Sequence, residues 1–235
     1  MSEETDIELG TSHGTNKGLA IEWDFVALGG LPRAFDAARA RLARASLDLT
    51  PVLFSRYLLG RPLEEGLARL VAAVGAKSKA VDAAPDIHAA FASSLEEAMP
   101  KPRAEVVRFV KDMAARGLKI GLMTQIPEET AKPFVAALDV GDAAVLLPEP
   151  ATCVGGSGWD AWRRAPRKLQ LADRMGVAIA VSADSARGAL AAGLGVIALP
   201  DALTQHQDYT GADLVTERFT DEVSRVILEL LRLEE

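Results

Sequence analysis

The chain of 235 residues has little cysteine and little aromatic content, and it lacks any long apolar run. Its one cysteine, Cys153, cannot form an internal disulfide. No apolar stretch reaches the ~18 residues that a membrane-spanning helix needs. Acids and bases are interspersed at a net charge of −7, so no basic stripe indicates nucleic-acid binding. These absences predict a soluble, cytoplasmic protein without membrane or nucleic-acid partners.

Histidine is scarce as well, with only His13, His88 and His206 in the chain. Their spacing does not match a metal site, and Cys153 has no base near it in the sequence, so a zinc site or a thiol nucleophile is not expected. Residues 1–16 are polar and contain no apolar core of a signal peptide. This segment is predicted to be a flexible tail.

What the chain does have is apolar content, at 49%, which is enough for a sizeable core. Residues 30–99 show apolar side chains at helical spacing and no convincing strand, which predicts an all-helical insert. From residue 100 onward, helical and strand patterns alternate, which is typical of a doubly wound parallel sheet. We therefore predict an α/β core of residues 17–29 and 100–235, interrupted by the helical segment.

The individual elements of this core follow from apolar periodicity. The first strand is expected over 19–23. The later elements expected are a helix over 104–116, a strand over 119–123, a helix over 128–138, a strand over 143–147, a helix over 159–175, a strand over 177–182, a helix over 186–192, a strand over 196–198 and a helix over 221–233.

Acids and a hydroxyl stand where predicted strands end. Glu22 and Asp24 follow the first apolar run, Thr124 follows the second, and Asp184 follows the run that begins at Val177. Because the carboxyl ends of parallel strands meet at one edge of a sheet, these side chains are expected to share a cleft. The common alternative is that an acid at the end of a strand is a solvated loop residue without a function.

The order of acid pair, hydroxyl and acid resembles the haloacid dehalogenase-like (HAD) hydrolases, over roughly residue 17 to the C-terminus. The resemblance implies a Rossmann-like core and a helical cap formed by residues 30–99. In that family the first strand ends in Asp-x-Asp-Gly-Thr, whereas this chain has Glu22-Trp23-Asp24-Phe25-Val26. The favoured alignment places Glu22 at the nucleophile and Asp24 at the general acid and base. A register slipped by two residues makes Asp24 the nucleophile instead.

The other motifs also match with departures. Thr124 and Gln125 resemble the second motif, which binds phosphate. Arg163 stands where the family has a lysine, and Lys168 is the alternative cation; arginine keeps the charge but not the shape. Asp184 resembles the metal ligand of the fourth motif, although Ala183 replaces its usual acidic neighbour.

The resemblance implies a phosphatase of a small phosphorylated metabolite, such as a sugar phosphate. It also implies Mg²⁺, held by Glu22, Asp24 and Asp184 and bound weakly or lost because of the departures. The same departures favour an alternative, a catalytically inactive member that binds a ligand or a protein. A dehalogenase is a third alternative, which is possible only in the slipped register, where Asp24 is the nucleophile. The segment Cys153–Gly158 lacks the ending of a phosphate loop and is predicted to be a flexible loop.

Overall fold

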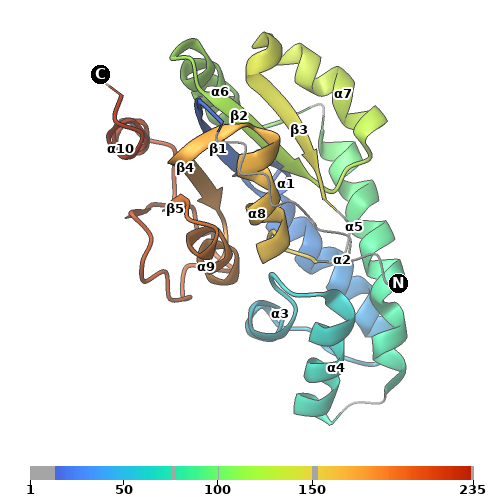
Figure 1. Ribbon diagram of the computed structural model, residues 1–235. Coiled ribbons are helices and arrows are strands. Elements are labelled where there is room, and N and C mark those ends of the chain that lie inside the picture. The colour runs from blue at the N-terminus through green and yellow to red at the C-terminus, as the bar shows by residue number, and fades with distance from the viewer. Residues whose placement is uncertain (1–13, 76–77, 100, 150–152, 234–235) are drawn as a thin grey trace, which may run out of the picture.

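The computed structural model describes residues 14–75, 78–99, 101–149 and 153–233. The predicted tail over residues 1–13 lies outside this part of the chain. The six strands form one parallel sheet in the order β3-β2-β1-β4-β5-β6 (Figure 1). The strands are β1 (Asn16–Glu22), β2 (Lys119–Thr124), β3 (Ala144–Pro148), β4 (Leu171–Ala180), β5 (Gly195–Ala198) and β6 (Leu214–Val215). The predicted doubly wound α/β sheet is confirmed.

Helices cover both faces of this sheet and extend beyond one end of it. Their bounds are α1 (Trp23–Val26), α2 (Gly30–Arg44), α3 (Pro51–Tyr57), α4 (Leu63–Val74), α5 (Ala84–Ala98), α6 (Ala104–Ala115), α7 (Glu128–Ala137), α8 (Trp159–Lys168), α9 (Ala183–Ala191) and α10 (Asp221–Leu230), with short 3₁₀ turns η1 (Ser78–Ala83) and η2 (Gly141–Ala143). None of the described helices is long and apolar enough to cross a membrane.

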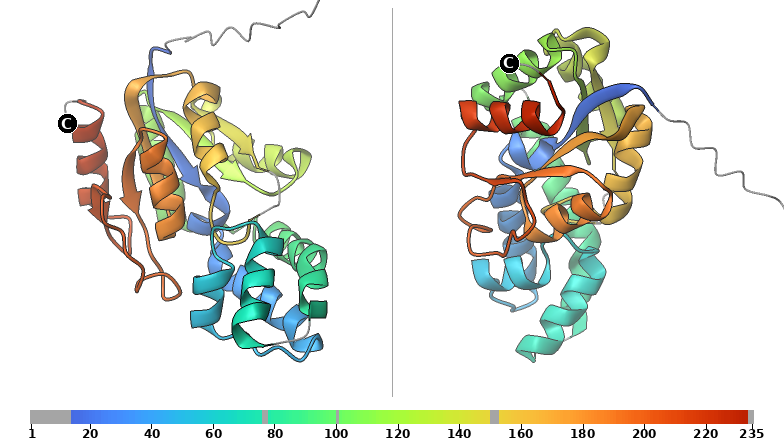
Figure 2. Two further views of the ribbon diagram at one scale, coloured as in Figure 1. Left: turned by 60° about the horizontal axis from the view of Figure 1, so that its bottom comes forward. Right: turned by 60° about the vertical axis from the view of Figure 1, so that its left-hand side comes forward.

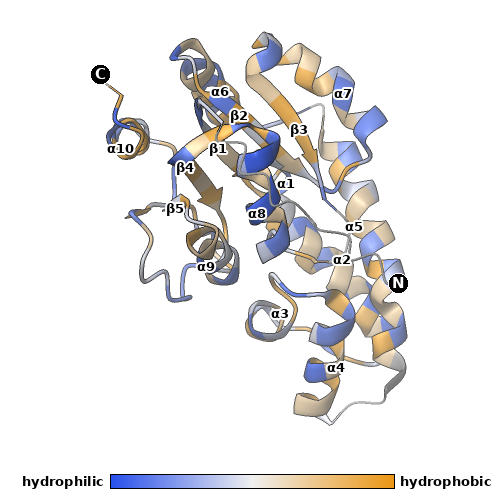
Figure 3. Cartoon of the chain, in the orientation of Figure 1, coloured by the Kyte–Doolittle hydropathy of each residue, from blue (hydrophilic) through white to orange (hydrophobic). Residues whose placement is uncertain are grey.

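The two faces of β1 and β4 differ in side-chain size. Leu19 and Ile21 of β1 belong to the main buried apolar cluster, which also includes residues of α6, α7 and α10. Ala20 points to the opposite face and, with Ala178 and Ala180 of β4, packs against α8 and α9. Successive side chains of a strand alternate between faces, so small residues on one face let those two helices approach closely. Figure 3 shows apolar strands beside the largely hydrophilic α8.

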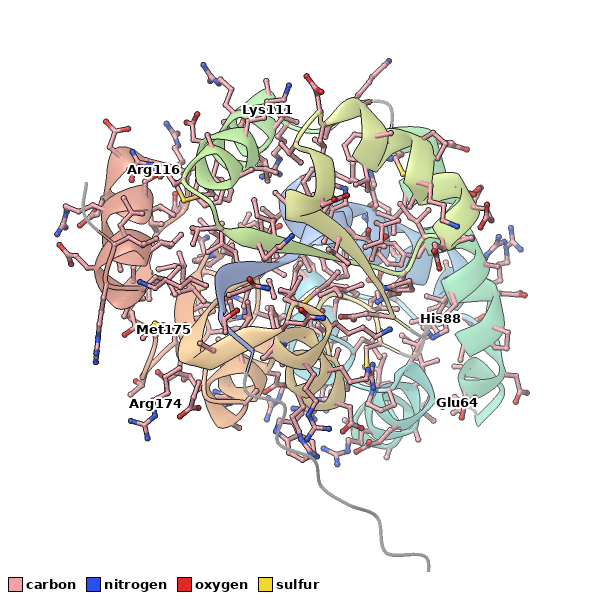
Figure 4. The ribbon with its side chains drawn as sticks, turned by 45° about the horizontal axis from the view of Figure 1, so that its top comes forward. Glu64, His88, Lys111, Arg116, Arg174 and Met175 are labelled. Atoms are coloured by element: carbon pink, nitrogen blue, oxygen red, sulfur yellow. The ribbon has the colours of Figure 1, made fainter. Side chains whose placement is uncertain are left out.

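The predicted helix over 159–175 is wrong in its second half, because α8 ends at Lys168 and β4 begins at Leu171. Gln170 ends the helix with a positive φ of 52°. The register then jumps: Asn16 pairs with Leu171, but Gly18 pairs with Gly176. The residues between, which include Arg174 and Met175 labelled in Figure 4, bulge out of the ladder.

Residues 30–99 form no strand among their described positions and fold into α2 to α5 with η1, as predicted for the helical segment. Figure 2 shows these helices gathered beyond the carboxyl edge of the sheet. One face of α4 is buried at Leu63, Leu67 and Leu70, whereas Val74 is exposed. Residues 30–99 are called the cap below, and the rest of the described chain is called the core.

Candidate functional site

Glu22 is the last residue of β1, and its side chain is fully buried. Oε1 accepts hydrogen bonds from the backbone N–H of Ser157 and from the Ser185 hydroxyl, the latter at 2.6 Å. Oε2 accepts from the backbone N–H of Val181 at 2.7 Å. The indole of Trp162 donates in turn to the Ser185 hydroxyl at 2.9 Å. Both oxygens of Glu22 are therefore engaged by donors of the protein itself.

The glycine-rich segment Cys153–Gly158 covers this carboxylate. The prediction of a flexible loop is wrong, because residues 153–157 are all buried. The amide of Gln125 donates to the Cys153 carbonyl at 2.8 Å, and Gly60 of the cap donates to the Val154 carbonyl at 3.1 Å. Gly156 has a φ of 149°, which L side chains rarely adopt, and a Cβ added there would lie only 3.0 Å from Ser182 Oγ, so glycine suits this position.

Asp24 lies two residues further on, in α1, with 1% of its surface exposed. Its Oδ1 accepts from the Thr124 hydroxyl at 2.7 Å, and its Oδ2 accepts from the backbone N–H of Gln125 at 2.7 Å. The structure thus brings four of the sequence-predicted residues together at the carboxyl ends of β1 and β2, namely Glu22, Asp24, Thr124 and Gln125.

A third acid, Glu149, was missed by sequence reasoning. It follows the end of β3, and its backbone N–H donates to the Thr124 carbonyl at 2.8 Å. Its Oε1 is buried without a hydrogen-bond partner among the residues described. The signal was present in the sequence, since Glu149 ends an apolar run in the same way as Glu22 does.

Burial dominates the ionisation of these acids. It raises the pKa of Glu22 above its ordinary range, although the bonds from Ser185, Ser157 and Val181 act in the opposite direction. Burial, together with the nearby charge of Glu22, raises the pKa of Asp24 to about 7 and that of Glu149 to about 8. At neutral pH the cluster of three carboxyl groups therefore retains protons.

Asp184 lies in a different environment from Glu22. The predicted helix over 186–192 begins earlier, at Ala183, so Asp184 stands in the first turn of α9 rather than at the end of a strand. Its carboxylate pairs with Arg61 of the cap at 3.5 Å and with Arg187 at 2.5 Å. About a third of the side chain, 35%, is exposed.

The predicted cations also lie elsewhere. The Arg163 guanidinium is exposed and stacks on the Trp159 ring, 4.5 Å from its centroid. Lys168 is exposed at the end of α8. Burial raises the pKa of Glu149, and the charge of Arg164 acts weakly in the opposite direction. Sequence reasoning gave no reason to choose Arg164 over its neighbour.

The donor set does not fit the magnesium ion that the resemblance implies. Mg²⁺ takes oxygen ligands, but the carboxylate oxygens of all three predicted ligands are already engaged: those of Glu22 and Asp24 accept from N–H and O–H groups, and those of Asp184 pair with two arginines. Within the described ranges, no group of three or more acidic, histidine or cysteine side chains is arranged to hold a metal ion.

No protein-family model and no curated protein matches the sequence, but many solved structures match the fold. CbbY from Rhodobacter sphaeroides, solved with xylulose-1,5-bisphosphate, has a TM-score of 0.62 and 17% identity over 86% of this chain and 94% of its own. β-Phosphoglucomutase from Clostridium difficile has a TM-score of 0.67 and 12% identity over 93% of this chain and 100% of its own.

A HAD family hydrolase from Deinococcus radiodurans, solved with bound phosphate and sodium, has a TM-score of 0.57 and 16% identity over 94% of this chain and 98% of its own. At these identities the likeness establishes the fold. The parallel six-stranded sheet, the cap inserted after its first strand and these similarities lead to one conclusion: the chain has the fold of the HAD-like hydrolases.

Proposed function

We propose that this chain is a HAD-fold protein that binds a small ligand without hydrolysing it. The observation that supports this proposal is the sealed environment of Glu22. A carboxylate that attacks phosphorus needs an oxygen with an open approach of about 3–3.5 Å to the reacting atom. Both oxygens of Glu22 instead accept protein hydrogen bonds beneath the segment Cys153–Gly158, and the side chain is fully buried.

The proposal also gives Glu22 a structural role. The extra methylene of glutamate lets one carboxylate reach Ser157 on the covering segment and Val181 after β4. The residue that departs most from the family motif is therefore the one that holds the covering segment against the sheet.

A second candidate function is the phosphatase that the resemblance implies. It is favoured by the contacts of Asp24 with Thr124 and Gln125 at the carboxyl edge of the sheet. It is also favoured by the pKa of Asp24, which at about 7 suits a general acid and base. In this reading Glu22 attacks phosphorus, Arg163 holds the phosphate and Asp184 supports a magnesium ion. The covering segment would first have to leave Glu22.

Phosphate release from p-nitrophenyl phosphate and ribose 5-phosphate separates the two functions. We expect no turnover above the buffer rate for the wild type, Glu22→Asp or Asp24→Asn, with excess Mg²⁺ or with a chelator. We also expect equal melting temperatures in Mg²⁺ and in chelator. Turnover that requires Mg²⁺ and disappears in Asp24→Asn would establish the phosphatase and reject the binding proposal.

A further inference from the structure

A cavity of about 690 Å³, within the range of small-molecule sites, lies where the two connections between the core and the cap meet. The first connection contributes Phe25 and Val26 ahead of α2, and the second contributes Arg103 ahead of α6; both helices are labelled in Figure 1. The backbone N–H of Arg103 donates to the Ala27 carbonyl at 2.9 Å, which joins the two connections. We call this cavity the junction pocket and define it by Phe25, Leu31, Arg103, Glu105, Glu217 and Arg218.

The junction pocket lies on the side of the sheet opposite to the groups that engage Glu22. Phe219, which lines the pocket, packs on Phe109 of α6 with ring centroids 4.6 Å apart. Trp162 and Ser185 hold Glu22 from α8 and α9, which pack on the other face of the sheet. The pocket is therefore separate from the acid cluster and from the segment that covers it.

Apolar side chains form the floor of the junction pocket. They are buried and belong to Phe25, Val26, Leu31, Val181 and Leu199. Phe25 and Val26 stand where the resembling family has Gly-Thr, and that pair would leave little side-chain hydrocarbon here. The floor is thus supplied in part by a departure from the family motif, and it suits an apolar side chain of a ligand.

The rim of the pocket carries two guanidinium groups and two carboxylates. They belong to exposed residues, namely Arg103, Arg218, Glu105 and Glu217. No ion pair in the described part of the chain involves any of these four side chains. Both signs of charge are therefore available to a ligand, in equal number.

The third carboxylate at the pocket, Asp201, is engaged by its own loop. Its Oδ1 accepts from the backbone N–H of Leu203 at 2.8 Å, and its backbone N–H donates to the Thr204 hydroxyl at 2.9 Å. A ligand with charge of one sign would be attracted by half of the remaining charges and repelled by the other half. A ligand that carries one charge of each sign is complementary to both halves.

We propose that the junction pocket binds a small zwitterion with an apolar side chain, an α-amino acid or a dipeptide. The ligand carboxylate accepts charge-assisted hydrogen bonds from Arg103 or Arg218, and its ammonium group donates to Glu105 or Glu217. Its side chain lies on the apolar floor. The inference rests on the proposed function, since it names the ligand that is bound and not hydrolysed.

Isothermal titration calorimetry with L-leucine and leucyl-leucine tests the inference on the full chain. We expect saturable binding, and the tighter of the two ligands distinguishes an amino-acid site from a dipeptide site. The N-acetylated and the C-amidated forms of that ligand should each bind about tenfold more weakly, because each lacks one charge-assisted contact. Glycine should bind about tenfold more weakly than L-leucine, because it has no side chain to bury.

Variants at the rim locate the site. Arg103→Gln/Arg218→Gln should weaken binding of the zwitterion about tenfold and leave binding of its amide unchanged, because the amide has no carboxylate. Glu105→Gln/Glu217→Gln should weaken binding of the zwitterion to a similar degree and leave the N-acetylated form unchanged.

The matched control is Arg39→Gln/Arg108→Gln, which removes two exposed arginines of α2 and α6 that do not line the pocket. This variant changes the net charge by the same amount and should bind the zwitterion like the wild type. Melting curves without ligand check that each variant is folded.

Three outcomes would reject the junction pocket: no saturable binding of either zwitterion, a blocked form that binds as tightly as its parent, or wild-type affinity in both rim variants. The proposed function fails in a different way, through Mg²⁺-dependent phosphate release in the turnover assay. The two failures are therefore distinguishable.

Discussion

At the scale of single residues, Glu22 and Asp24 have different hydrogen-bonding requirements. The two carboxylate oxygens of Glu22 accept from the backbone N–H groups of Ser157 and Val181, so both oxygens must be acceptors. Asp24 accepts from one N–H and from the hydroxyl of Thr124, and a hydroxyl can donate or accept. Only Asp24 therefore has a neutral isostere that satisfies its partners.

Asp24→Asn should change how stability depends on pH. Burial raises the pKa of Asp24 from 3.8 to about 7, so between these values the folded protein keeps a proton that the unfolded chain has released. Stability contributed by this group is therefore present at low pH and lost as pH rises toward 7. We expect urea unfolding to show the wild type losing roughly 2–3 kcal/mol more than Asp24→Asn between pH 5 and pH 8.

The control for this measurement is Asp36→Asn, at an exposed position of α2. Its unfolding free energy should follow the wild type across the same range of pH. Parallel curves for the wild type and Asp24→Asn would show that Asp24 is ionised throughout, and they would contradict the raised pKa.

At the scale of elements, the segment Cys153–Gly158 determines whether Glu22 is accessible. It forms isolated bridges with the cap, where Val154 pairs with Leu59 and Cys153 with Pro62. Gly155 has a φ of 81°, in the left-handed region that favours glycine. The segment is therefore held by the core on one side and by the cap on the other.

Gly155→Ala should destabilise the protein more than a matched glycine substitution does. A Cβ at Gly155 would lie 2.9 Å from the buried Leu59 side chain, whereas a Cβ at Gly117, with a nearly identical φ of 82°, would have no atom within 4 Å. Both variants incur the cost of positive φ, but only the first forces overpacking. Chemical denaturation should place Gly155→Ala below Gly117→Ala by about 1–3 kcal/mol.

Equal losses in the two variants would show that the segment moves away from Leu59 at little cost. In that case the cover over Glu22 would be easily opened, and the phosphatase would become the better proposal. Limited proteolysis of both variants checks the same point by a second method.

At the scale of the whole molecule, the cap and the core share one apolar interior. Phe25, which directly follows Asp24, stacks on Phe91 of α5 with ring centroids 5.8 Å apart. The Arg33 guanidinium donates to the carbonyls of Leu28 and Ser94 and so joins α2 both to the end of the α1 segment and to α5. The apolar pair Phe25-Val26 stands where the resembling family has Gly-Thr, and both residues are buried here. This packing favours a cap that stays closed.

The cap and the core should therefore unfold together. All three tryptophans lie in the core, so fluorescence reports the core, while circular dichroism at 222 nm has a large contribution from the cap helices. We expect the two urea transitions to coincide in midpoint and slope. A dichroism transition at lower urea than the fluorescence transition would reveal a cap that opens independently.

The sequence by itself determined the class of the fold and half of the candidate site. Alternation of apolar strands with amphipathic helices requires a parallel sheet, and parallel strands deliver their ends to one edge. That reasoning placed Glu22, Asp24 and Thr124 at one edge, where the structure has them, but it also placed Asp184 there. It applied equally to Glu149, which also follows an apolar run. Glu149 stands between two prolines, however, and this pattern is typical of a loop.

Only the tertiary structure decided which groups reach one another. Asp184 was placed by its position after an apolar run and Arg163 by motif spacing, but the early start of α9 and the stacking of Arg163 on Trp159 orient their side chains elsewhere. The sequence did not predict that Cys153–Gly158 covers Glu22. Glycines allow the backbone to come close to other groups, but they do not specify which groups those are. The contacts of this segment with Glu22 and Leu59 join positions far apart in the chain, so no local pattern in the sequence encodes them.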